Sequence, residues 1–85
     1  MSSLTNKKIN QGQLIKLLVT LGYENIRATG GHLIFKHPNS NSVIALRHAR
    51  KNEIVPIFIA ASVYRNIIDN KIISPEKLLE EIEKL

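Results

Sequence analysis

The chain has 85 residues, which corresponds to one small domain with a modest hydrophobic core. It contains no cysteine, which excludes disulfides, thiolate metal sites and a cysteine nucleophile. No run approaches the ~20 apolar residues of a membrane helix, and the first residues lack the apolar core of a signal peptide. We therefore expect a single cytoplasmic domain over residues 1–85, with a core over 10–70 and an added helix over 74–85.

The net charge of +5 is unevenly distributed along the chain. Residues 1–51 carry one acidic residue, Glu24, and eight basic ones: Lys7, Lys8, Lys16, Arg27, Lys36, Arg47, Arg50 and Lys51. Residues 52–85 carry four basic and six acidic residues. A positive field on one half of a protein attracts polyanions, so nucleic acid is the first candidate partner. A basic surface that serves only solubility is the alternative.

The first predicted element is a helix from about Gln11 to Leu21. Asn10 and Gln13 form a capping-box pattern at its start, and Gly22 favours the left-handed stop after its last turn. Apolar residues at helical spacing form one stripe for the core: Leu14, Leu17, Leu18 and Leu21.

From Tyr23 the period changes from helical to alternating, which predicts a first strand over about residues 23–28. Alternation places Ile26 and Ala28 on one face of this strand and Arg27 on the other.

The second strand is predicted over residues 32–37. Leu33 and Phe35 face the core in this arrangement, so the opposite face carries His32, Ile34 and Lys36. Residues 38–42 have the Pro, Asn and Ser composition of a turn.

The third strand is predicted over residues 43–48, with Ile44 and Leu46 facing inward and Arg47 facing outward. A one-residue slip in register would exchange His48 for Arg47. In the unslipped register an antiparallel meander gathers four side chains on one surface: Arg27, His32, Lys36 and Arg47.

A second helix is predicted from about Pro56 to Asn70. Its buried stripe comprises Ile57, Ala60, Ala61, Tyr64, Ile67 and Ile68, and further apolar residues lie elsewhere on its circumference: Phe58, Ile59 and Val63. This is more apolar surface than a small sheet can cover. The third helix, which begins with Ser74 as cap and Pro75 in its first turn, folds over this surface, or a partner covers it, or both.

His32 is the leading functional candidate because it follows a glycine pair at the start of a strand. Gly30 and Gly31 allow a ligand to approach the backbone closely, and equally they fit the closing turn of a hairpin. This setting suits a histidine that handles phosphate, either by binding or by catalysis.

RNA cleavage by attack of a 2′-hydroxyl on its neighbouring phosphate needs an acid–base group and a cation, and no metal. Histidine is an acid–base group of this kind, and the candidate cations are Arg27, Lys36 and Arg47. Lys36 and Arg47 are equally well interpreted as solvated strand residues. The amides of Gly30 and Gly31 are candidate phosphate donors. His37 and His48 are interpreted as structural. We expect no metal site, because the three separated histidines are not accompanied by clustered Asp or Cys. We also expect no cofactor.

The order helix, three-stranded sheet, helix resembles the double-stranded-RNA-binding architecture, so the expected class is α+β with a short C-terminal helix. More specifically, the segment from Leu14 to Pro38 and the pair Arg47-His48 resemble the HicA family of toxin mRNA interferases. The family usually has serine where this chain has Gly31, and proline where it has Leu46.

This resemblance implies that His32 is catalytic and that a HicB-type antitoxin binds the chain and masks the histidine face. The resulting hypothesis is a type II toxin that cleaves mRNA as a metal-independent endoribonuclease, a hydrolase that inhibits translation in a stress response. Its general acid or base is His32. The alternatives are a non-enzymatic RNA-binding module of the same fold and a degenerate toxin that acts through protein interaction.

Overall fold

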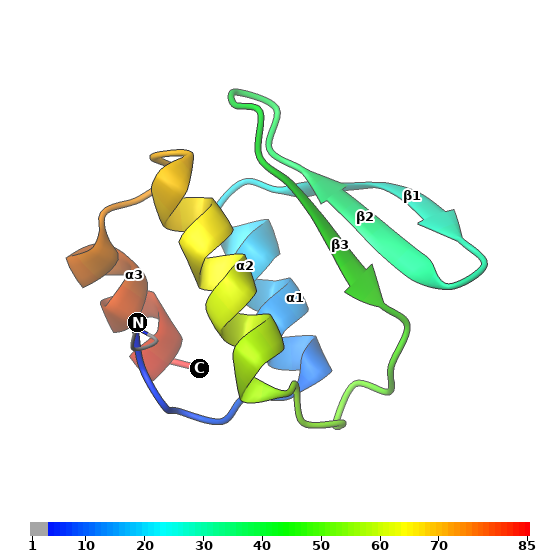
Figure 1. Cartoon of the computed structure of the whole chain (residues 1–85), viewed down its shortest axis with the longest axis horizontal. Helices are drawn as coiled ribbons and strands as arrows, with labels where there is room; N and C mark the ends of the chain where they lie inside the picture. The colour runs from blue at the N-terminus through cyan, green and yellow to red at the C-terminus, as the bar shows by residue number, and fades with distance from the viewer. Residues whose placement is uncertain (1–3) are drawn as a thin grey trace.

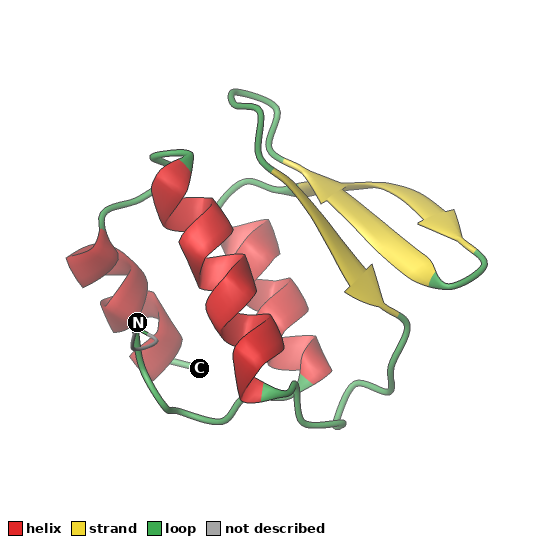
Figure 2. Ribbon diagram, viewed as in Figure 1, coloured by secondary structure: helices red, strands yellow, loops and turns green. Residues whose placement is uncertain are grey.

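The computed structural model describes residues 4–85, except for the side chains of residues 27–29. Its elements follow one another as α1 (Gln11–Thr20), β1 (Glu24–Thr29), β2 (His32–Lys36), β3 (Val43–Arg47), α2 (Ile57–Asp69) and α3 (Pro75–Glu83). The strands form one antiparallel sheet in the order β1-β2-β3, with α1 and α2 beside it and α3 on the far side of these helices (Figures 1 and 2). This confirms the predicted α+β class. Across the described residues, none of the helices combines the length and apolar character needed to cross a membrane.

Helix α1 begins and ends as its sequence predicts. The side chain of Asn10 accepts a hydrogen bond from the backbone N–H of Gln13, and the side chain of Gln13 accepts one from the N–H of Asn10, both at 2.8 Å. Gly22 has a φ of 97°, the left-handed conformation that lets the chain turn out of the helix into β1. The core stripe of α1 is buried at Leu14, Leu17 and Leu18.

The sheet has a buried, apolar inner face and a more exposed outer face. Phe35, Ile44 and Leu46 are buried on the inner face, and their neighbours in β2 and β3 lie on the outer one. The β2–β3 ladder pairs His32 with Arg47 and Lys36 with Val43. The register is therefore the one in which Arg47, rather than His48, shares a face with His32.

Strand β1 departs from the strict alternation predicted for it. The register with β2 shifts between Asn25 and Arg27, so Ile26 has no partner in β2, and its side chain is 54% exposed. A β-bulge inserts one extra residue into one strand and interrupts the alternation of its side chains. The prediction is therefore wrong at Ile26.

Helix α2 buries a slightly different stripe from the predicted one. Ala60, Val63, Tyr64 and Ile67 are buried, whereas Ile57 is 42% exposed, so the prediction is wrong for Ile57 and for Val63. Leu78 and Ile82 of α3 are fully buried in the same core, so the third helix covers part of the apolar excess. The first turn of α2 remains uncovered.

A buried polar network ties the β2–β3 turn to α2. Ser42 is fully buried, and its hydroxyl donates to the side-chain oxygen of Asn66 at 2.6 Å. The hydroxyl of Tyr23 therefore donates to Ser42 Oγ, at 2.5 Å, and the amide of Asn66 donates to the carbonyl of Val43 at 3.1 Å. The network lies at the end of the β2–β3 hairpin where Lys36 pairs with Val43, opposite the end that carries His32.

Candidate active site and nucleic-acid interface

His32 is exposed at the first position of β2, directly after the loop of the β1–β2 hairpin. Thr29 pairs with His32, so Gly30 and Gly31 form a two-residue hairpin loop. A Cβ atom on either glycine would have no neighbour within 4 Å, so there is open space beside the loop. The hairpin interpretation of the glycine pair is thus confirmed, and the space above the loop remains free.

The loop is tied to the end of β3. The backbone N–H of His48 donates to the carbonyl of Gly31 at 3.4 Å, which continues the β2–β3 ladder one step beyond the pair of His32 and Arg47. The backbone of His32 is thereby fixed at this end of the sheet by pairing with β1 and β3.

Among the sheet cations whose side chains the structure describes, Arg47 is the one paired directly with His32. Side chains of directly opposed residues in an antiparallel pair lie about 5 Å apart at Cβ, on the same face. The guanidinium is 78% exposed and lies 3.9 Å from a carboxylate oxygen of Glu53, which is 50% exposed. An ion pair this open to water is worth little in stability, so Arg47 can exchange this partner for a phosphate at little cost.

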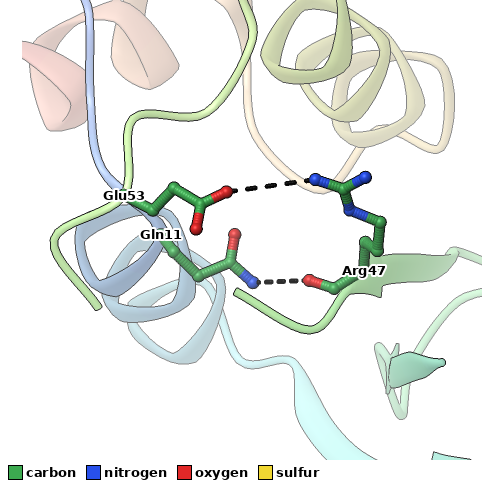
Figure 3. A network of polar contacts seen from close by, with 3 residues as sticks. All are labelled: Gln11, Arg47 and Glu53. Atoms are coloured by element: carbon green, nitrogen blue, oxygen red, sulfur yellow. Dashed lines mark hydrogen bonds and ion pairs between the residues drawn. The ribbon is translucent and has the colours of Figure 1, made fainter. Parts of the chain in front are cut away.

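The backbone around Arg47 is held by the start of α1. Gln11 is buried, and its side-chain N–H donates to the carbonyl of Arg47 at 3.1 Å (Figure 3). The backbone N–H groups of Gln11 and Gly12 donate to the carbonyls of Glu53 and Lys51, each at 2.8 Å. The first turn of α1 therefore positions both the end of β3 and the basic loop that follows it.

A pocket of about 330 Å³ opens beside His32 between the end of β3 and the start of α2. Gln11, His32, Arg47 and Glu53 form its polar part. The apolar lining includes Ile54, Phe58 and Ile59, which are 55%, 70% and 37% exposed. The uncovered first turn of α2 therefore borders the candidate catalytic histidine.

Lys36 shares the outer face with His32 but lies at the other end of β2, four residues away, or about 13 Å along the strand. Its ammonium donates to the carbonyl of Ser40 at 3.2 Å. The backbone of Arg27 pairs with Ile34 in the middle of the sheet, and its side chain lies outside the described part of the structure. The structure thus brings Arg47, and not Lys36, to His32.

His37 is held by its neighbours on the other side of the sheet. Its Nδ1 accepts the backbone N–H of Asn39 at 3.3 Å, which leaves Nε2 to donate to the carbonyl of Leu21 at 3.1 Å. The ring also meets Tyr23 edge-on, with 5.2 Å between centroids. Both ring nitrogens are therefore engaged and the ring is in contact with Tyr23, as expected for a structural role. Within residues 4–85 no three His, Cys, Asp or Glu side chains lie close enough to form a metal site.

Gln11, Glu53 and Phe58 are among the lining residues to which the sequence assigns no functional role. In the sequence Gln11 is an ordinary residue of a first helical turn. No local pattern indicates that the loop after Arg47 packs against it. The sequence feature that could have identified Phe58 as a lining residue is its position outside the predicted buried stripe of α2.

The family model described as "HicA toxin of bacterial toxin-antitoxin" matches residues 12–63, from α1 to the middle of α2. No curated protein and no solved structure matches the chain. The matched region contains His32, Arg47 and the pocket residue Phe58. Because the match spans more than half of the chain, the chain belongs to the HicA toxin family of bacterial toxin–antitoxin systems.

Proposed function

We propose that the chain is a metal-independent endoribonuclease that cleaves mRNA and so inhibits translation, as the toxin of a type II system active in the stress response. In this proposal residues 1–85 act as one HicA-like domain in the cytoplasm, and a HicB-type antitoxin is the inhibiting partner. His32 is the catalytic residue. Membership of a toxin family supports the biological role, and the geometry around His32 supports the chemistry.

The observation that carries the proposal is the pairing of an exposed imidazole with an exposed guanidinium. His32 and Arg47 are direct partners at the edge of the sheet, and the glycine loop beside them leaves room for a ribose–phosphate chain. An acid–base group and a cation that share one open face are the two components that phosphodiester cleavage needs.

The proposed reaction begins when the 2′-hydroxyl oxygen of a ribose attacks the adjacent phosphorus. The hydroxyl proton passes to a base, the bond from phosphorus to the 5′-oxygen breaks, and the 5′-oxygen takes up a proton from an acid. His32 serves as the base or as the acid, since histidine exchanges protons near neutral pH. The products are a 2′,3′-cyclic phosphate and a 5′-hydroxyl.

Arg47 is proposed to stabilise the additional negative charge on the pentacoordinate phosphorane. The backbone amides of Gly30 and Gly31 are proposed as further donors to the phosphate oxygens. Lys36 and Arg27 are proposed to bind other phosphates of the RNA along the outer face. The distance along β2 between Lys36 and His32 suits binding along the strand rather than contact with the reacting phosphate.

The test is to incubate the purified protein with an end-labelled mRNA in the presence of EDTA. We expect fragments that end in cyclic phosphate, and no cleavage at a site where a single 2′-deoxyribose replaces ribose. RNA that stays intact, or a deoxy-substituted site that is still cut, would contradict the proposal.

A further inference from the structure

We propose that the pocket beside His32 binds one unpaired nucleobase of the RNA, stacked on Phe58, next to the phosphate that is cleaved. This inference rests on the proposed function and adds to it that the substrate must be single-stranded at the cleavage site.

The apolar side of the pocket presents an aromatic ring to solvent. Phe58 is 70% exposed in the first turn of α2, and Ile54 and Ile59 flank the same cavity. Large apolar side chains gathered in a hollow of a basic protein indicate a ligand with an apolar face. Nucleobases have such a face, and proteins that hold single-stranded RNA stack them on aromatic rings.

The polar side of the pocket carries groups that match the edge of a base. The Nε2 of Gln11 donates to the carbonyl of Arg47. The carboxamide oxygen of Gln11 remains as an acceptor in the space between Arg47 and Glu53 (Figure 3). The carboxylate of Glu53 is a second acceptor. Acceptors of this kind receive the exocyclic amino groups and ring N–H groups of bases.

The charge around the pocket favours RNA over an apolar peptide as its occupant. Arg47 lines the cavity, and Arg50 and Lys51 are exposed in the loop that forms its rim. An aromatic side chain surrounded by cations suits single-stranded RNA, because a base can stack on the ring while the cations neutralise the phosphates. The volume of about 330 Å³ is at the lower end for ligand pockets and suits one small planar group.

A base can enter this pocket only when it is unpaired and unstacked. Because His32 lines the same cavity, the base that occupies it belongs to a nucleotide that adjoins the reacting phosphate. A phosphate within a stable duplex is then not cleaved, although the outer face of the sheet still binds its backbone.

The test compares two uncleavable probes of equal length in fluorescence anisotropy. One is a single-stranded 2′-O-methyl oligoribonucleotide, and the other is its abasic counterpart, which keeps the sugar–phosphate chain. We expect Phe58→Ala to weaken binding of the first probe at least about fivefold, the lower end for one stacked base, and to leave the abasic probe unchanged. Phe58→Trp, which keeps an aromatic platform, retains the affinity of the unsubstituted protein.

The matched control is Val19→Ala, which shortens another exposed apolar side chain, 59% exposed, outside the pocket. It leaves both affinities unchanged. Equal binding of the base-bearing probe by Phe58→Ala and the unsubstituted protein overturns the inference, and so does an equal loss for both probes. If mRNA is still cleaved in either case, the proposed nuclease function stands without the base pocket. RNA that is neither bound nor cleaved overturns both.

Discussion

Arg47 stands directly opposite His32 in the β2–β3 ladder, and both side chains are exposed. The pairing arises from two ordinary features of the sequence, a two-residue hairpin loop that starts β2 at His32 and a turn that sets the register of β3. One slip of register would have placed Arg47 on the core face. The geometry of the candidate site is thus a direct consequence of strand pairing.

Replacing Arg47 tests its contact with phosphate. We expect Arg47→Gln to lower affinity for single-stranded RNA and to reduce the slope of log K against log salt concentration by about 0.7, the value for one lost phosphate contact. The measurement is a salt titration of binding. Lys77→Gln removes an exposed cation on α3, in the acidic half of the chain, and serves as the control with an unaltered slope. An unaltered slope in Arg47→Gln would show that this side chain does not bind phosphate.

Two glycine substitutions are expected to differ in their effect on stability. A Cβ at Gly31 meets nothing within 4 Å, so Gly31→Ser should leave the free energy of unfolding unchanged or raise it by up to about 1 kcal/mol, since the unfolded chain loses freedom. Gly22 has a φ of 97°, and a Cβ there would lie 3.2 Å from Nε2 of His37. Gly22→Ala should therefore lower the free energy of unfolding by about 1–2 kcal/mol.

Urea unfolding of both variants checks this pair. Equal losses would show that the hairpin loop is as constrained as the end of α1. Gly31→Ser also restores the serine usual in the family, so its cleavage rate reports whether that hydroxyl aids the reaction.

Ser42 links Tyr23 to Asn66 in the buried network. Ser42→Ala leaves the Tyr23 hydroxyl without its acceptor, and we expect the free energy of unfolding to fall by about 1–3 kcal/mol. Ser62→Ala, at an exposed position of α2, is the control and should change it by less than about 0.5 kcal/mol. Chemical denaturation measures both. A loss in Ser42→Ala no larger than in the control would mean that the network does not stabilise the fold.

Tyr64 is buried, and its hydroxyl has no hydrogen-bond partner among the described residues. We expect Tyr64→Phe to raise the free energy of unfolding by about 1 kcal/mol, because an unpaired polar atom leaves the core. Unfolding by urea near neutral pH measures this gain. A loss of stability would show that the hydroxyl is satisfied in solution.

Burial also raises the pKa of the Tyr64 phenol above its ordinary value of 10.0. The unfolded phenol ionises at that ordinary value, so above pH 10 the folded state binds more protons than the unfolded state. The free energy of unfolding therefore falls as pH rises past 10. Tyr64→Phe should show a smaller fall, with Tyr23, whose pKa burial also raises, accounting for part of the remainder. An identical alkaline fall in both proteins would contradict this assignment.

The elements were predictable because their local signals agree with the packed fold. The capping box at Asn10 and the proline after Ser74 set helix starts, and the alternation in β2 and β3 predicts which residues lie on the outer face. These signals involve only residues that are close together in the sequence, so they can be recognised without knowledge of tertiary contacts. The bulge at Ile26 was not predictable, since it depends on how β1 pairs with β2.

The pocket is the part of the site that local patterns did not indicate. It depends on the loop after Arg47 returning to the first turn of α1, where backbone carbonyls of Lys51 and Glu53 accept hydrogen bonds. Hydrogen bonds between segments that are far apart in the chain produce no periodic pattern in the sequence. It also explains why Gln11 and Phe58, far apart in the chain, face the same cavity as His32.

The most direct measurement for the central claim is the cleavage rate of one labelled mRNA by His32→Ala, with RNA affinity determined on the same preparation. We predict that cleavage falls by at least about 100-fold, the contribution of one general acid–base group, while affinity changes little. His48→Ala, which removes a second exposed imidazole just beyond β3, should cleave as the unsubstituted protein does. Cleavage by His32→Ala at the unsubstituted rate would contradict the account.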